Sequence, residues 1–272
     1  MSSIVTWTRR HRLVAFFGLT FLLSWWSWPF YAVDLAPTAF FPCGPLVAAL
    51  VVIGIADGRA GYRELGARMI RWRVGWPWWL VAVGTPLAVL AVAAAANVAL
   101  WDAPAPVLAG IAWTQVALGA AIRLVNPLDG PLGEEPGWRG YALPQLQVRR
   151  SPLVSGVVLG VVVALWHLPL VATGQLPAVG LPITFAITLV YVWLFNRTGG
   201  SVLMTMIFHI AQGTVSYGAL GFTGADAARM DRLVGVLWFA IALAVVVLDR
   251  QAWRVAPAAA VAERPVAAVA AR

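Results

Sequence analysis

Three ionisable side chains lie within or shortly after long apolar segments. Glu134 lies in a short polar segment, whereas His167 and His209 each lie inside a long apolar run. Such a group is costly in a membrane-length apolar segment, so each is a candidate functional residue. A carboxylate could activate water as a general base while the imidazoles polarise a carbonyl or hold an oxyanion. The same three residues could instead bind a divalent metal such as zinc. Both arrangements lead to hydrolysis.

The sequence around Glu134 predicts a broken helix. Proline and glycine interrupt helical structure just before it, at Pro127, Gly130, Pro131 and Gly133. Since proline is tolerated in the first turn of a helix, Pro136 predicts a new helix that begins near Glu134. Both carboxylates would then lie at a helix N-terminus, where the macrodipole stabilises negative charge. Glu135 and Arg139 are spaced for an i, i+4 pair, which leaves Glu134 available and makes Glu135 a supporting residue.

The composition fixes the class of protein. Of 272 residues, 61% are hydrophobic and 11% are charged, against about 25% charged in ordinary soluble domains. This excludes a soluble fold, a disordered chain and a disulfide scaffold. We therefore expect an all-α polytopic membrane protein that forms a single membrane domain over residues 1–272, with the lipid bilayer as its surroundings.

About eight transmembrane helices are expected, because each span needs about 20 apolar residues. The candidate spans are 13–33, 38–56, 77–101, 106–126, 153–172, 179–195, 201–220 and 233–249, and the break described above follows the fourth. All 19 basic residues are arginine; with the N-terminus in the cytoplasm, 15 fall in cytoplasmic segments and 2 outside. We expect both termini in the cytoplasm of a bacterial cell and no nucleic-acid partner. The alanine-rich stretch 256–272 is expected to be a disordered cytoplasmic tail.

Buried acids and histidines also have explanations other than catalysis. They can hold transmembrane helices together, or they can form an ion or proton pathway. The pathway reading is the weakest, because the sequence has no internal repeat of the kind that many transporters show. The residues by themselves leave catalysis and helix packing open.

Three motifs in order add a resemblance. GEEPGWRGYALPQLQ, LWHLPL and GGSVLMTMIFH resemble the CPBP family, the CAAX-protease and bacteriocin-processing (Abi) intramembrane endopeptidases, over a core of about residues 120–215. The resemblance implies an intramembrane protease that cleaves a peptide or membrane-protein substrate near the cytoplasmic face. It implies Glu134 as the water-activating residue, with His167 and His209 as partners and Glu135 and Arg139 as supports. It leaves a metal-dependent and a metal-free mechanism open.

One position departs from the family pattern. The third motif usually has asparagine four residues after its histidine, where it helps to hold the oxyanion; this chain has Gly213. Gln212 could take over that role only if the helix is distorted, because it lies about 100° around the helix. The departure therefore keeps an alternative open, in which the chain is a catalytically weak or inactive membrane scaffold or immunity protein of the same fold.

Overall fold

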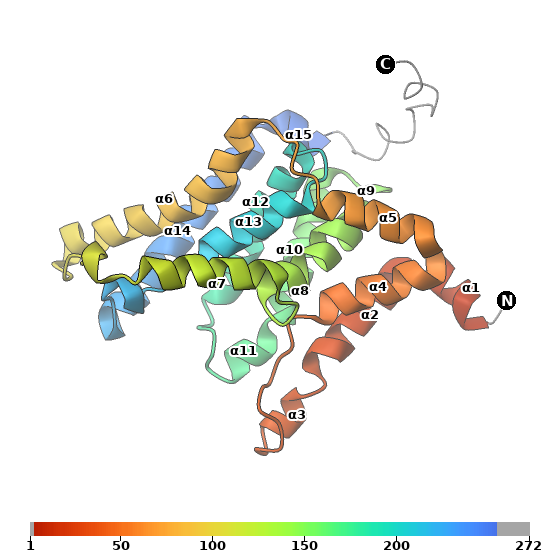
Figure 1. Ribbon diagram of the computed structural model, residues 1–272, viewed down its shortest axis with the longest axis horizontal. Helices are drawn as coiled ribbons and strands as arrows, with labels where there is room; N and C mark the ends of the chain where they lie inside the picture. The colour runs from red at the N-terminus through yellow and green to blue at the C-terminus, as the bar shows by residue number, and fades with distance from the viewer. Residues whose placement is uncertain (1–2, 255–272) are drawn as a thin grey trace.

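A computed structural model describes residues 3–254 of the protein, which form helices and no strands (Figure 1). The predicted tail at 256–272 lies outside the described residues. The α-helices are α1 (Ser3–Arg10), α2 (Arg12–Trp25), α3 (Trp28–Tyr31), α4 (Gly44–Ala56), α5 (Gly58–Met69), α6 (Trp76–Trp101), α7 (Trp113–Val125), α8 (Gly130–Gly137), α9 (Leu143–Gln147), α10 (Pro152–Trp166), α11 (Leu168–Ala172), α12 (Gly180–Arg197), α13 (Val202–Gly213), α14 (Gly224–Leu248) and α15 (Arg250–Arg254). A π-helical turn, η2 (Trp138–Ala142), joins α8 to α9.

The all-α polytopic architecture is confirmed. Within the described residues, five helical segments are long and apolar enough to cross a membrane: Arg12–Tyr31, Trp76–Trp101, Pro152–Ala172, Gly180–Arg197 and Gly224–Leu248. Two further apolar helices, α4 and α13, are shorter. The fourth predicted span corresponds to α7, and α8, η2 and α9 follow the predicted break after it.

Three predicted spans are shorter than expected. The second begins at Gly44 instead of residue 38. The fourth begins at Trp113 instead of residue 106, because Pro104 and Pro106 keep the preceding segment out of an α-helix. The seventh, α13, ends at Gly213 instead of residue 220. A helix ending at glycine is common, since glycine adds no side-chain contacts and has the largest backbone entropy to lose.

The ends of several helices meet through polar contacts on one side of the molecule. Arg12 at the start of α2 pairs with Asp57 at the end of α4, at 2.7 Å. Ser201, before α13, donates a hydrogen bond to the carbonyl of Arg71, at 2.7 Å. Arg197 at the end of α12 pairs with Asp249 after α14. These contacts gather the arginine-rich connections that the sequence assigned to one membrane face.

An aromatic cluster lies between this end and the centre of the molecule. Trp138 of η2 and Trp166 of α10 are fully buried and meet edge to face with ring centroids 5.5 Å apart. Phe16 packs edge-on against Trp138 at 5.5 Å, and Phe40 packs against Trp166 at 4.4 Å. Buried aromatic pairs of this kind stabilise by about 0.5–1.5 kcal/mol beyond their buried area, so the cluster holds α2, η2 and α10 in fixed register.

Candidate active site

The predicted break after the fourth span is present, but the new helix starts earlier than expected. α7 ends at Val125, and α8 begins at Gly130. Asp129 caps α8 by accepting a hydrogen bond from the Gly130 amide at 2.7 Å. The expectation that the helix begins near Glu134 is therefore wrong: both glutamates lie in the second turn, outside the first turn where the free N–H groups point. Asp129, and not Pro136, determines where this helix begins.

The π turn after α8 has an identifiable supporting contact. Pro144 at the start of α9 has no N–H, so it cannot donate to the carbonyl of Gly140 four residues earlier. Arg68 of α5 supplies the missing donor, with its Nη1 atom 2.6 Å from that carbonyl oxygen. π-Helical turns inside α-helices are frequent at functional sites. Here the π turn directly follows α8, which bears the two carboxylates.

α8 lies at the middle of the molecule and packs against α4, α7 and α13 (Figure 1). This arrangement brings the first and third motifs together. Glu135 is fully buried, and its Oε1 atom accepts a hydrogen bond from Arg139 Nη1 at 3.0 Å. The same oxygen lies 2.9 Å from Nδ1 of His209 on α13. The predicted i, i+4 pair of Glu135 and Arg139 is therefore confirmed.

The contact with Glu135 also determines which nitrogen of the His209 ring donates a hydrogen bond. A carboxylate only accepts, so Nδ1 of His209 carries the proton that it donates to Glu135. The other ring nitrogen, Nε2, lies beside Gly130 at the start of α8. Glu135 is thus the residue that orients this imidazole, a role that the sequence did not assign to it.

Glu134 faces the same space from the other side. A Cβ atom built on Gly130 would lie 2.7 Å from His209 Nε2 and 2.9 Å from Glu134 Oε1. Both catalytic candidates therefore approach the bare Cα of one glycine, and any side chain there would stand between them. Glu134 is 7% exposed, which leaves its carboxylate in a dry setting where electrostatic interactions are strong.

His167 lies at the junction of α10 and α11, next to Trp166. Its Nδ1 atom is 2.8 Å from the carbonyl oxygen of Val163, so this nitrogen donates and Nε2 is left free. The ring lies 6.0 Å from the ring of Phe40 and stacks on it. The ring also meets that of Trp166 edge to face at 4.9 Å, and Trp166 packs on Trp138 of η2 at 5.5 Å, which puts the second motif in the neighbourhood of the first.

Tyr191 of α12 is a site residue that the sequence analysis missed. Its ring lies under the Arg139 guanidinium, 4.0 Å from the ring centroid, and meets the His209 ring edge to face at 5.8 Å. A cation over an aromatic face is attracted by the ring quadrupole. The tyrosine therefore holds both a supporting residue and a candidate catalytic residue. No local motif marks it, because the contact joins residues 52 positions apart in one case.

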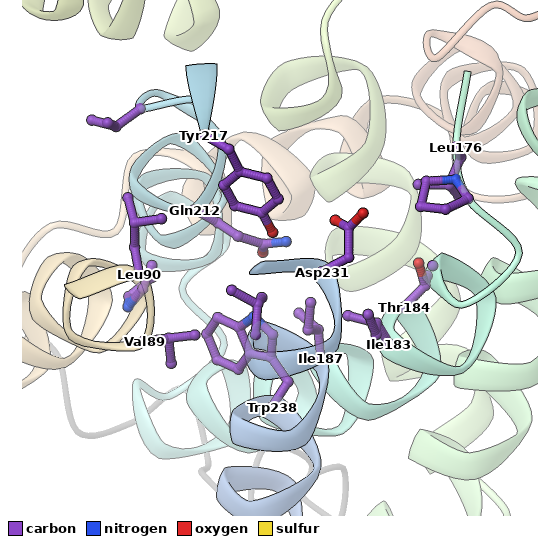
Figure 2. A pocket seen from close by; sticks show the side chains of 15 residues that line it. Val89, Leu90, Leu176, Ile183, Thr184, Ile187, Gln212, Tyr217, Asp231 and Trp238 are labelled. Carbon is purple, nitrogen blue, oxygen red and sulfur yellow. The ribbon is translucent and has the colours of Figure 1, made fainter. Parts of the chain in front are cut away.

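Gln212 turns away from α8. Its Oε1 atom accepts a hydrogen bond from the Tyr191 hydroxyl at 3.1 Å. It lines a cavity of about 200 Å³ in which Tyr217, Asp231 and Trp238 also lie (Figure 2). α13 is a regular helix up to Gly213, so the distortion that would bring Gln212 to the His209 face is not seen.

Arg123 of α7 lies beside Gly213. It is the second residue to which the sequence analysis gave no role in the site. Its Nε atom pairs with Asp129 at 3.1 Å, and its Nη1 atom contacts the carbonyl of Ile210 at 3.4 Å. A Cβ atom on Gly213 would lie 2.6 Å from Nη1. The guanidinium fills the space that a side chain at position 213 would need.

The metal-binding alternative for Glu134, His167 and His209 is not supported by the described residues. Within residues 3–254, no three histidine, cysteine, aspartate or glutamate side chains form a group that could hold a metal ion. We therefore derive no step through zinc from Glu134, His167 and His209.

A larger cavity of about 680 Å³ lies beyond the site, between α5, η2, α9 and the end of α12. Gly140 and Tyr141 of the π turn line it, together with Arg68 and Arg71. It therefore lies at the arginine-rich side of the molecule, one to two turns past Glu134 along the same helical segment.

Comparisons with known proteins agree with the motifs. Residues 118–215 match the model of the Rce1-like family, described as type II CAAX prenyl endopeptidase Rce1-like. CAAX prenyl protease 2 of Methanococcus maripaludis is 31% identical over 88 residues, which cover 28% of this chain and 32% of that relative. The aligned segment thus spans about a third of the relative's length. Both findings confirm the resemblance to the CAAX-protease family, and the family match covers the segment that carries all three motifs.

Proposed function

We propose that this protein is an intramembrane endopeptidase that hydrolyses a peptide bond with water activated by Glu134. The observation that carries the proposal is the space over Gly130, which the Glu134 carboxylate and Nε2 of His209 both face. A water molecule between them would lie within reach of a general base and beside an imidazole of fixed orientation. The family match over residues 118–215 independently supports proteolysis.

The proposed chemistry uses only groups of this chain. Glu134 takes a proton from the water as the water oxygen attacks the carbonyl carbon of the scissile peptide bond, and the π electrons of the C=O bond move to the carbonyl oxygen. Nε2 of His209, when protonated, donates to the resulting oxyanion, and the Glu135 carboxylate stabilises the imidazolium. The tetrahedral intermediate then expels the amine, which takes the proton from Glu134. His167, whose Nδ1 donates to the Val163 carbonyl, keeps Nε2 as an acceptor that can take a hydrogen bond from an N–H group of the substrate backbone.

We further propose that the arginine-rich side faces the cytoplasm and that cleavage takes place toward this face. The asymmetry of the arginines supports this orientation. The cavity of about 680 Å³ beside the π turn lies on the same side and offers room for a peptide segment. The substrate class that fits is a peptide or the tail of a membrane protein.

The test compares protein termini in the native host between wild type and a chromosomal Glu134→Gln variant at matched expression. Glutamine keeps the size of the side chain but cannot accept the proton. We expect a set of termini to vanish in the variant. The matched control is Asp34→Asn, which removes one carboxylate from an exposed position with a φ of 58°, where asparagine is well tolerated.

If the Glu134→Gln and wild-type termini are the same with both proteins present and folded, the proposal is wrong. The non-catalytic scaffold or immunity role would then account for the fold. In that role, only substitutions that unfold the protein, such as Arg139→Ala, would have an effect.

A further inference from the structure

The Arg123 guanidinium lies beside Gly213 on α13, four residues after His209. Position 213 is four residues after His209, so both lie on one face of the helix, about one turn apart. His209 contacts Glu135 of α8, and Gly213 lies against Arg123 of α7. A Cβ atom on Gly213 would lie 2.6 Å from Nη1 of Arg123 and 3.0 Å from its Nη2. The absence of a side chain at position 213 is what lets the cation approach.

Two contacts hold the guanidinium in this place. Asp129 accepts from the Nε atom of Arg123 at 3.1 Å, and the carbonyl of Ile210 accepts from Nη1 at 3.4 Å. Asp129 also caps α8 through the Gly130 amide at 2.7 Å. The cation is therefore coupled to Gly130, over which Glu134 and His209 meet. Its position is fixed by the elements that form the site.

The terminal nitrogens keep donors that no group of the chain uses. A guanidinium has five N–H groups, and within residues 3–254 the side-chain hydrogen bonds of Arg123 engage only Nε and Nη1. Nη2 has no protein partner there. The side chain is 18% exposed, so its charge is partly desolvated and acts strongly on a nearby anion.

We propose that Arg123 is a further catalytic residue, which donates from its terminal N–H groups to the oxyanion of the tetrahedral intermediate. This inference rests on the proposed function. As water adds to the scissile carbonyl, the oxygen gains a full negative charge between the His209 ring and the guanidinium. Arg123 stays protonated throughout, and its hydrogen bonds strengthen as the charge develops. The Arg123 guanidinium thus donates the hydrogen bond to the oxyanion that an amide side chain on residue 213 would donate.

A purely structural role makes a different prediction. Arg123 also joins the end of α7 to α8 and α13, so a variant could lose activity by loosening these helices. An oxyanion donor mainly lowers kcat and leaves KM nearly unchanged, because it acts in the transition state. A helix tie lowers thermal stability and the amount of folded enzyme instead.

The experiment uses the purified full chain in lipid with a fluorogenic peptide copied from a terminus that depends on Glu134. We expect Arg123→Gln to lower kcat by ~10²–10³, with KM changed less than severalfold. The matched control is Arg150→Gln, at an exposed position, which should behave like wild type. If Arg123→Gln keeps the wild-type kcat while Glu134→Gln is inactive, Arg123 is not an oxyanion donor. The proposed function would then still stand.

Reciprocal substitution gives the second readout. Gly213→Asn should lower kcat in the wild-type background, because its Cβ collides with Nη1. In the Arg123→Ala background the same asparagine has room and places a neutral donor where the guanidinium was. We expect the double variant to exceed Arg123→Ala in kcat by at least about tenfold, without a matching gain in thermal stability. A double variant no faster than Arg123→Ala overturns the proposal. If wild type itself shows no Glu134-dependent cleavage, both the proposed function and this inference fall.

Discussion

Gly130→Ala is the smallest change that tests whether Glu134 and His209 work on one water molecule. The added methyl carbon would stand 2.7 Å from His209 Nε2 and 2.9 Å from Glu134 Oε1. Ordinary contacts of carbon with such atoms are longer than 3 Å, so the methyl group takes the place of a bridging water. General acid–base catalysis contributes about 10²–10⁴-fold. We therefore expect kcat to fall by at least ~10².

The effect of the same change on stability should be small. Alanine in a helix is favoured over glycine by about 0.5–1 kcal/mol, and overpacking of a tight site costs about 1–3 kcal/mol. The net change of a few kcal/mol at most shifts Tm by several degrees for a chain of this size, at roughly 2–4 °C per kcal/mol. The variant should remain folded at the temperature of the assay.

The assay measures kcat with the purified protein in lipid and Tm of the same samples. Gly119→Ala on the neighbouring helix α7 is the matched control, because a Cβ atom there meets nothing within 4 Å. It should leave kcat unchanged. If Gly130→Ala keeps wild-type kcat and is as stable as the control, the space over Gly130 does not hold the reacting water and the reasoning is refuted.

Two further predictions concern the supports of the site. Glu135→Gln removes the charge that Arg139 and His209 share; since Arg139 is 2% exposed, the unpaired cation should lower the free energy of unfolding by about 3–5 kcal/mol. Thermal unfolding checks this, and an unchanged Tm would contradict the role of the buried pair. Arg68→Met removes the donor to the Gly140 carbonyl and should cost about 1–3 kcal/mol, with faster amide exchange at residues 138–142. Arg63→Met on the exposed side of the same helix is the control, and equal exchange in the two variants would show that Arg68 does not support the π turn.

Much of the fold and part of the site could be predicted from the sequence. Long apolar runs dictate membrane-length helices, and the proline- and glycine-rich segment before Glu134 dictates a break. The pair of Glu135 and Arg139 follows from spacing within one helix. These features depend on residues close together in the chain, so local pattern suffices.

The remainder of the site depends on tertiary contacts. Tyr191 reaches Arg139 and His209 from another helix, and Arg123 reaches Gly213 across a gap of 90 positions, so no spacing rule reveals either. The second role of Glu135, which orients His209, also arises only when α8 meets α13. The start of α8 differs from the predicted one for a different reason. Asp129 and Pro136 are both local signals for a helix start, and the helix begins after Asp129.

The most direct test of the central claim follows the oxygen of the attacking water. Purified wild-type protein and the Glu134→Gln variant are incubated in heavy-oxygen water with membranes from a host that lacks the protein, and new C-termini are identified by mass spectrometry. Hydrolysis through Glu134 predicts new C-terminal carboxylates that carry one heavy oxygen in the wild-type sample and none in the variant sample. Equal labelled termini in both samples, or none in either, would contradict the assignment of Glu134 as the residue that activates water.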